Sequence, residues 1–357
     1  MNRYNGVLKE SEGDPSLMEA YLPNIYETSH AANLLQLDND DILCAWFSGS
    51  GEGNPDTNVI VSRLNAGSTQ WAEPIDLSGD PKHSEQNPVL FQSPDGKVWL
   101  FHTSGLPHRE DTAKIIVLIS DDRGNTWEKP KVLFDSAGAF IRHPLVILKN
   151  GSWILPVYYW DKNGHYSAVK ISPDEGKSWE EFSVDKSRHR VQMNIIKLDD
   201  TTLLAYFRSR QADRIYSSLS KDMGKTWTAP KKTILPNNNS STQSVKLESG
   251  NLIMVYNDAT LERDQIRPFM KEGKLVKKLL RTPLTIALSE DKGKTWPFVR
   301  NIQISDDEYL ENQMGYSYPS VIQAEDGKIH IAYTYLRKGI KHVILDEEWI
   351  KSAQEHI

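Results

Sequence analysis

The chain has 357 residues, of which 38% are hydrophobic and 25% are charged, as is typical of a soluble globular protein with a hydrophobic core. Its net charge of -6 gives no electrostatic basis for binding nucleic acid or an anionic membrane surface, so we expect neither as a partner. One cysteine excludes an internal disulfide, and the N-terminal residues form no apolar signal region, so we expect a cytoplasmic protein.

The first repeated unit is a pair of apolar segments that flank a polar turn, at residues 33–46. Apolar residues that alternate around such a turn are typical of a β-hairpin. Similar hairpin patterns follow along the chain, starting at Pro88, Pro144, Asn194, Ser244 and Ser320. Upstream of the first unit, residues 4–8 are predicted to add a strand.

An octapeptide, Ser-x-Asp-x-Gly-x-(Thr/Ser)-Trp, follows four of these hairpins, at residues 120–127, 172–179, 220–227 and 289–296. Its Ser and Asp side chains can bond the backbone of a tight turn, and its Gly supplies a left-handed conformation. A divergent copy lies at residues 62–71. Each octapeptide is therefore predicted to form the turn between the third and fourth strands of its unit.

One long insertion interrupts the fifth unit, from Asp258 to Leu280, and it is rich in Lys, Arg and Glu. A loop of this length is more often functional or mobile than structural. Residues 271–280 are interpreted as a helix.

Six hairpin units, with starts roughly 50 residues apart, fit four strands per unit. The predicted fold is therefore all-β, a six-bladed β-propeller that forms a single domain over residues 1–357, with the 258–280 insertion in blade five. The octapeptides set the strand order of each blade.

The octapeptide resembles the Asp box of the sialidase (neuraminidase) superfamily, whose members contain BNR repeats, and the resemblance extends over nearly the whole chain. It implies a propeller whose Asp boxes lie on the rim, away from a central substrate site. It also implies a glycosidase with a glycan or oligosaccharide substrate. In sialidases three arginines bind the substrate carboxylate, an aspartate is the acid/base, and a tyrosine is the nucleophile, an exception to the usual pair of carboxylates.

Four positions match this pattern in order and spacing. Asp56 lies on the loop after the second strand of blade one, where the resemblance places the acid/base. Arg208 and Arg281 correspond to two of the carboxylate-binding arginines, and an arginine fork suits a planar carboxylate. Tyr316, at the start of blade six, corresponds to the nucleophile.

Three positions depart from the pattern. His30 replaces the first carboxylate-binding arginine, Gln192 replaces the glutamate that activates the tyrosine, and Thr334 replaces the glutamate that supports the first arginine. Joint loss of an arginine and its carboxylate partner is consistent, since an unpaired buried charge is costly. His30 is retained as a catalytic candidate, because a histidine can bind a carboxylate when protonated or act as acid/base near neutral pH.

Three more residues are expected in the central site by repeat symmetry, namely Asn87, His143 and Gln243, which begin or precede first strands. Amide, histidine and arginine groups suit a hydroxylated sugar. No spacing typical of metal ligands or of a phosphate-binding loop occurs, so we expect no metal and no cofactor.

The sequence thus predicts an exo-acting glycoside hydrolase of sialidase type that removes a terminal sialic acid or a related acidic sugar. Two alternatives remain open at this point. One is a glycosidase or lyase for another sugar, such as a uronate- or rhamnose-containing one. The other is a propeller that binds carbohydrate without catalysis. The sequence predicts neither the sugar nor the oligomeric state.

Overall fold

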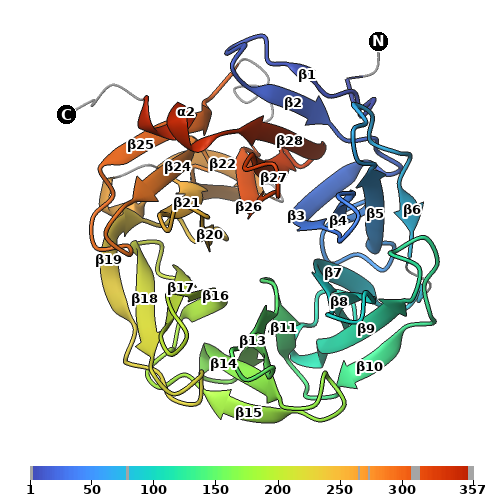
Figure 1. The fold of residues 1–357 in the computed structure, drawn as a ribbon, viewed down its shortest axis with the longest axis vertical. Coiled ribbons are helices and arrows are strands. Elements are labelled where there is room, and N and C mark those ends of the chain that lie inside the picture. Colours follow the sequence, from blue (N-terminus) through green and yellow to red (C-terminus); the bar gives the residue numbers. More distant parts are fainter. Residues whose placement is uncertain (1–2, 78–79, 264–265, 272–273, 307–313, 353–357) are drawn as a thin grey trace.

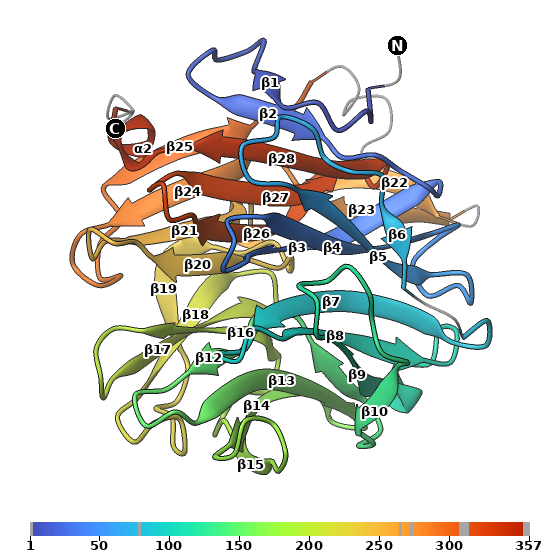
Figure 2. The same cartoon turned by 45° about the vertical axis from the view of Figure 1, so that its right-hand side comes forward.

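The computed structural model describes residues 3–77, 80–263, 266–271, 274–306 and 314–352. Six antiparallel sheets surround a central axis, with the first strand of each sheet innermost (Figure 1). The six-bladed β-propeller predicted from the repeats is therefore confirmed. In the turned view, neighbouring blades pack face to face (Figure 2). No helix in the described part of the chain has the length and hydropathy needed to cross a membrane.

The first three blades follow one another along the chain. Blade one contains β3 (Thr28–Gln36), β4 (Ile42–Gly49), β5 (Asn58–Leu64) and β6 (Ile75–Asp76). Blade two contains β7 (Ser84–Gln92), β8 (Val98–Gly105), β9 (Lys114–Ser120) and β10 (Lys131–Phe134), with a 3-10 turn, η1, at Glu110–Thr112. Blade three contains β11 (Ala139–Ile141), β12 (Val146–Ile147), β13 (Trp153–Asp161), β14 (Gly164–Ser172) and β15 (Glu180–Ser183).

Blades four and five have the same strand order, and blade five carries the insertion. Blade four contains β16 (Arg190–Lys197), β17 (Leu203–Ser209), β18 (Arg214–Ser220) and β19 (Lys231–Pro236). Blade five contains β20 (Gln243–Lys246), β21 (Leu252–Asn257), β24 (Leu284–Ser289) and β25 (Phe298–Gln303).

The insertion forms a separate two-stranded sheet after the 3-10 turn η2 (Leu261–Arg263). Strand β22 (Ile266–Lys271) pairs antiparallel with β23 (Lys274–Leu279). The helix expected over residues 271–280 is therefore wrong, because this segment is hydrogen-bonded to a neighbouring strand and not to itself.

Blade six joins the two ends of the chain. It contains β26 (Tyr316–Gln323), β27 (Ile329–Tyr335) and β28 (Gly339–Leu345), with β2 (Met18–Tyr21) and β1 (Lys9–Glu10) added from the N-terminal region. Helix α2 (Glu347–Lys351) follows β28. The N-terminal region closes the ring as expected, but the closing strand is β2 and not residues 4–8. Val7 forms only an isolated bridge to Gln70 in blade one.

The Asp boxes form the predicted turns between the third and fourth strands of blades two to five. In the first box, the Asp122 carboxylate accepts hydrogen bonds from the Thr126 backbone N–H at 2.8 Å and the Thr126 hydroxyl at 2.6 Å. The backbone N–H of Gly124 donates to Ser120 Oγ at 2.7 Å. The same contacts recur in the other three boxes.

A bulge interrupts the innermost strand of four blades at an equivalent place. In β3, β7, β16 and β26, two residues oppose one residue of the second strand. The first bulge residue has a left-handed backbone in each case: Ala31 (φ 62°), Asn87 (φ 52°), Gln192 (φ 52°) and Tyr318 (φ 54°). A bulge redirects side chains and is common next to active sites. These bulges therefore mark the central region where the site is expected.

Candidate active site

Tyr318 lies at the centre of the candidate site, on the bulge of β26. Its side chain is buried, and its hydroxyl accepts a hydrogen bond from Arg208 Nη1 at 2.6 Å. Arg208 also donates to Gln192 Oε1 at 3.2 Å and to Asn239 Oδ1 at 3.0 Å. Three elements thus meet at the Tyr318 phenol, namely the second strand of blade four, the bulge of blade four and the bulge of blade six.

Three guanidinium groups surround the Tyr318 ring. The Cζ atoms of Arg142, Arg208 and Arg281 lie 5.3, 5.7 and 5.5 Å from the ring centroid. Among the described residues, none of the three forms an ion pair with a carboxylate; Arg281 donates to Ser317 Oγ at 3.2 Å. Guanidinium groups without a paired carboxylate favour an anionic ligand.

The charge of these arginines changes the acidity of Tyr318. Burial acts to raise the pKa of the phenol, but the positive charges of Arg208 and Arg281, with a hydrogen bond to Gln192, hold the pKa below its usual value. A positive field and hydrogen bonds to the charged form both stabilise a phenolate. Tyr318 therefore loses its proton more easily than an ordinary tyrosine does.

Arg142, which the sequence analysis did not name, extends into the axis from blade three. It is 1% exposed, and it donates to the carbonyl oxygens of Ala32, Tyr318 and Pro319, each at 3.1 Å, and to Ser241 Oγ at 3.2 Å. Burial lowers its pKa to about 10. One sequence feature could have identified Arg142. It lies next to His143, at the place in blade three that corresponds to the bulges of the other blades.

His30 and Thr334, two of the three departures from the sialidase pattern, contact each other. His30 Nδ1 lies 2.7 Å from Thr334 Oγ1, and the imidazole packs on Tyr318 with ring centroids 4.1 Å apart. Burial, followed by the charges of Arg337 and Arg281, holds the pKa of His30 well below its ordinary value. His30 is thus a neutral ring against Tyr318 and does not supply the positive charge of the arginine that it replaces.

The loop between β4 and β5 brings Glu52, and not Asp56, toward the arginines. Asp56 is exposed, and its carboxylate accepts hydrogen bonds from the Ser50 backbone N–H at 3.1 Å and from the Ser50 hydroxyl at 2.9 Å. Glu52 Oε2 lies 2.9 Å from Arg337 Nη1. The structure therefore gives Asp56 a role in shaping the loop and places a different carboxylate beside the site.

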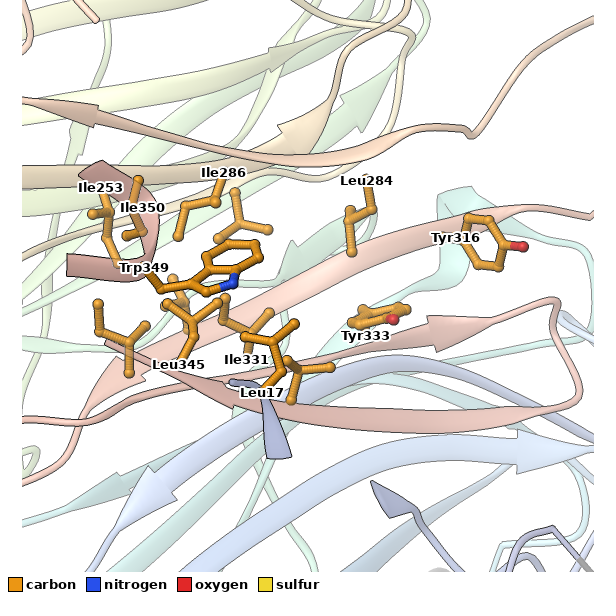
Figure 3. Packing of buried hydrophobic residues seen from close by; sticks show 14 of the residues in the cluster. Leu17, Ile253, Leu284, Ile286, Tyr316, Ile331, Tyr333, Leu345, Trp349 and Ile350 are labelled. Carbon is orange, nitrogen blue, oxygen red and sulfur yellow. The ribbon is translucent and has the colours of Figure 1, made fainter. Parts of the chain in front are cut away.

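Tyr316 is separated from this group, contrary to its expected place as the nucleophile. Its ring is 0% exposed and lies in the hydrophobic cluster between blades five and six, beside Tyr333 (Figure 3). Burial and a hydrogen bond to the Asp306 carboxylate raise the pKa of its phenol. In this position the Tyr316 side chain supports the core.

The remaining expected residues differ in their placement. Both amide atoms of Gln243 bond the backbone of Val321, at 3.2 and 3.3 Å, so Gln243 joins blade five to blade six and is not free to bind a sugar. His143 is 1% exposed, and neither ring nitrogen has a hydrogen-bond partner among the described residues. Asn87 is buried at the bulge of blade two.

A cavity of about 360 Å³ adjoins the Glu52 side of the site. It is lined by residues that include Glu52, Gln86, Arg109, Glu110 and Phe140, from blades one to three. A second cavity, of about 640 Å³, lies toward the other ends of the inner strands, where Lys197, Lys246 and Ile322 line it. None of the three arginines around Tyr318 lines that second cavity. These arginines do not line the smaller cavity either, but Glu52 does, and Glu52 contacts Arg337, so the smaller cavity is the one connected to the site.

Comparison with protein families gives a match over most of the chain. A family model described as a BNR repeat-like domain matches residues 40–331. A sialidase from Bacteroides fragilis (strain YCH46) is 25% identical over 228 residues, which cover 60% of this chain. The match covers 38% of that sialidase, so the chain corresponds to only part of the curated relative.

Solved structures show the same architecture. A Hadza microbial sialidase superposes with a TM-score of 0.75 at 15% identity, covering 91% of this chain and 67% of that one. The intramolecular trans-sialidase from Ruminococcus gnavus, in complex with oseltamivir carboxylate, gives a TM-score of 0.72 at 14% identity and covers 94% of this chain and 98% of its own. At these identities the similarity is one of fold.

Proposed function

The chain belongs to the BNR repeat-like domain family, and from that premise we propose that it is an exo-acting glycosidase of sialidase type. It removes a terminal sialic acid or a related acidic sugar from a glycan. The observation that supports this most directly is the position of Arg208 and Arg281 beside the Tyr318 phenol. The relatives described above are named sialidases, which supports glycosidase as the reaction class.

The substrate carboxylate binds to Arg208 and Arg281. Both side chains lie within 6 Å of the Tyr318 ring, and neither has a carboxylate partner among the described residues. Arg142 takes no direct part, because its N–H groups are used by backbone carbonyls and Ser241. A sugar acid would give Arg208 and Arg281 a carboxylate partner, and a bidentate fork would fix its orientation.

Tyr318 is the nucleophile in this proposal. The phenol is neutral when the anionic sugar binds, which avoids the repulsion that a carboxylate nucleophile would meet. It gives its proton to solvent as its oxygen attacks the anomeric carbon. Gln192 cannot accept the phenolic proton as a glutamate would. The positive charges of Arg208 and Arg281 lower the pKa of Tyr318 and so take over part of that role.

The proton for the leaving oxygen comes from the loop between β4 and β5. The sequence pattern favours Asp56, whereas Glu52 contacts Arg337 and lines the 360 Å³ cavity. Since an acid must reach the glycosidic oxygen, geometry favours Glu52. Asp56 remains the acid predicted from the sequence. The variant Asp56→Asn distinguishes the two candidates, because it should abolish turnover only if Asp56 is the acid.

Hydrolysis of a fluorogenic sialoside tests the proposal, together with glycans that end in sialic acid, Kdo, uronate or rhamnose. We expect turnover of an acidic sugar, and a loss of several orders of magnitude in kcat for Tyr318→Phe, because a nucleophile removed from the reaction cannot be replaced by binding. Tyr316→Phe is the matched control and keeps its activity, because its ring lies in the core.

Two results would contradict the proposal. If Tyr318→Phe turned over substrate at the wild-type rate, the Tyr318 phenol would be excluded as the nucleophile. Binding of acidic glycans without any turnover would favour a carbohydrate-binding propeller, in keeping with the replacement of an expected base by Gln192.

A further inference from the structure

The turn between β27 and β28 places Arg337 at the entrance of blade one. The Ser29 backbone N–H donates to the Arg337 carbonyl at 2.9 Å, next to His30 in the chain. The Leu336 backbone N–H donates to the Gly315 carbonyl at 2.9 Å. Arg337 is thus fixed between the start of β3 and the start of β26.

Arg281 reaches the same place from blade five. The Tyr316 backbone N–H donates to the Arg281 carbonyl at 2.8 Å. Gly315, with φ 74°, lies so close that a Cβ on it would be 2.6 Å from the Arg281 Cβ. Arg281 and the turn that contains Leu336 and Arg337 therefore both adjoin Gly315. Burial, followed by the charge of Arg337, lowers the pKa of Arg281 to about 10, and an anion beside the two guanidinium groups would offset this effect.

Glu52 is the carboxylate that contacts Arg337 in the free protein. Its carboxylate is 2.9 Å from Arg337 Nη1, while its side chain is 42% exposed and that of Arg337 is 18% exposed. Partial desolvation acts to raise the pKa of Glu52, but the charges of Arg337, and then of Arg281 and Arg208, hold that pKa below its usual value. A half-exposed carboxylate on a loop is easier to displace than a buried one, since water can take over its hydrogen bonds.

We propose that Arg337 is the third guanidinium that binds the substrate carboxylate, and that Glu52 is an internal carboxylate which the substrate displaces from it. The inference rests on the proposed function and names two further residues of the same site. It accounts for the neutral His30, because the positive charge absent from that strand is supplied by the turn hydrogen-bonded to Ser29.

Displacement also gives Glu52 a second task. Once Arg337 binds the sugar, Glu52 loses the contact that keeps it ionised and can carry a proton beside the 360 Å³ cavity. It gives this proton to the glycosidic oxygen as the bond to the anomeric carbon breaks. It regains a proton from the water that later releases the sugar from Tyr318, and the phenolate takes its own proton back from solvent, so the reaction balances as a hydrolysis.

Calorimetric titration tests the exchange of carboxylates without requiring turnover. The ligands are N-acetylneuraminic acid, glucuronic acid and the methyl ester of each, so that only the negative charge differs within a pair. We expect Arg337→Gln to weaken binding of the preferred acid about tenfold or more, because one charged hydrogen-bonding partner is lost. We expect Glu52→Gln to strengthen it severalfold, because the competing carboxylate is gone, yet to reduce kcat.

Arg123→Gln is the matched control for an arginine in an ion pair. Arg123 pairs with Asp38 at 2.6 Å on the first Asp box, with a side chain 52% exposed, and its loss should leave binding unchanged. Arg337→Lys retains the charge and should bind the acid more tightly than Arg337→Gln. Melting temperatures confirm that each variant is folded.

The outcomes separate the two proposals. If the wild type binds an acid in preference to its ester but Arg337→Gln binds equally well, or Glu52→Gln binds more weakly, the inference is overturned and the proposed function stands. If the wild type binds neither acid, or does not distinguish acid from ester, both are overturned.

Discussion

At the scale of single residues, a bulge decides which of two tyrosines reaches the site. In a regular strand residues two apart point to the same face, so Tyr316 and Tyr318 would lie on one side of β26. The shift in register between Ser317 and Ser320, with Tyr318 at φ 54°, separates them. Tyr316 enters the core between blades, whereas Tyr318 faces the arginines.

This separation predicts different acidities for the two phenols. Tyr318 has a pKa below its ordinary value of about 10, so its phenolate forms at a lower pH than a free tyrosine's, whereas the pKa of Tyr316 is raised. We expect the near-ultraviolet absorbance of wild type minus Tyr318→Phe to show one tyrosine ionising below pH about 10. In Arg208→Gln this transition moves to higher pH, because a stabilising positive charge is lost.

Tyr316→Phe serves as the control, and its difference spectrum should contain no transition in that range. A Tyr318→Phe spectrum identical to wild type below pH about 10 would contradict the assigned electrostatics. The titration needs no substrate, so it tests how Tyr318 is positioned apart from whether the protein is an enzyme.

The sequence predicted the blade entrances better than the side chains at them. Strand register places His30, Gln192 and Arg208, whereas Arg281 lies in the segment that precedes β24. Glu52 was not preferred over Asp56, since only the fold of one loop distinguishes two carboxylates four residues apart. Repeat symmetry also did not reveal that Gln243 is used by a neighbouring blade.

At the scale of elements, the Asp boxes were the best-predicted feature, because the hydrogen bonds that shape the turn are local. Serine, aspartate, glycine and threonine bond one another within eight residues, so the sequence contains the whole structure. The insertion lacked such a signal. Its apolar residues between 271 and 280 fit a helix or a strand, and pairing with Ile266–Lys271 decides between them.

Local bonding within the box predicts a dependence of stability on pH. Hydrogen bonds from the Thr126 hydroxyl and backbone N–H, and from Ser120, lower the pKa of Asp122 to about 2. Because the folded pKa lies below the unfolded value of about 3.9, the stabilisation is present above that pH and is lost as pH falls toward about 2. We expect Asp122→Asn to be less stable by about 1 kcal/mol at neutral pH, with the difference from wild type vanishing near the acid end.

Denaturant unfolding at several pH values measures this, and Asp121→Asn is the control. Asp121 is the next residue of the same turn, but its side chain is 66% exposed and pairs only with Lys97 in the described structure. Its exchange should change stability little at any pH. If the difference in unfolding free energy between Asp122→Asn and wild type stayed constant down to pH about 2, ionisation of Asp122 would be excluded as its cause.

At the scale of the whole molecule, polar side chains of the inner strands join consecutive blades. Asn33 accepts from the Leu90 N–H, Asn194 from Ser244, Gln243 from Val321, and Ser320 from Leu34, at 2.8 to 3.2 Å. Pairing of β2 with β28 closes the ring between the chain's two ends. The sequence predicted closure but chose the wrong strand, because pairing over this separation depends on the completed ring.

Arg142 connects the ring across its axis, and it carries the last prediction. From blade three it bonds carbonyls of blades one and six and a serine that precedes β20 of blade five. Replacement of a buried ion pair by apolar residues can be neutral, because both charges leave together. Here the acceptors are backbone carbonyls, which the substitution does not remove. Arg142→Leu therefore leaves several of them buried without a hydrogen-bond donor. We expect a loss of about 3 kcal/mol or more in the free energy of unfolding, since each such group costs about 1–3 kcal/mol.

Denaturant midpoints of Arg142→Leu, Arg142→Lys and Arg300→Leu measure the effect. A lysine ammonium can satisfy some of the carbonyls, so Arg142→Lys should fall between Arg142→Leu and the wild type. Arg300 is the control, because it also donates to a carbonyl, that of Trp349, but from a side chain 28% exposed, where water can replace it. Because Arg142 holds the carbonyl oxygens of Tyr318 and Pro319, Arg142→Lys should also shift the Tyr318 titration, which Arg300→Leu should not. Equal stability of Arg142→Leu and wild type would show that the blades hold the ring without this connection.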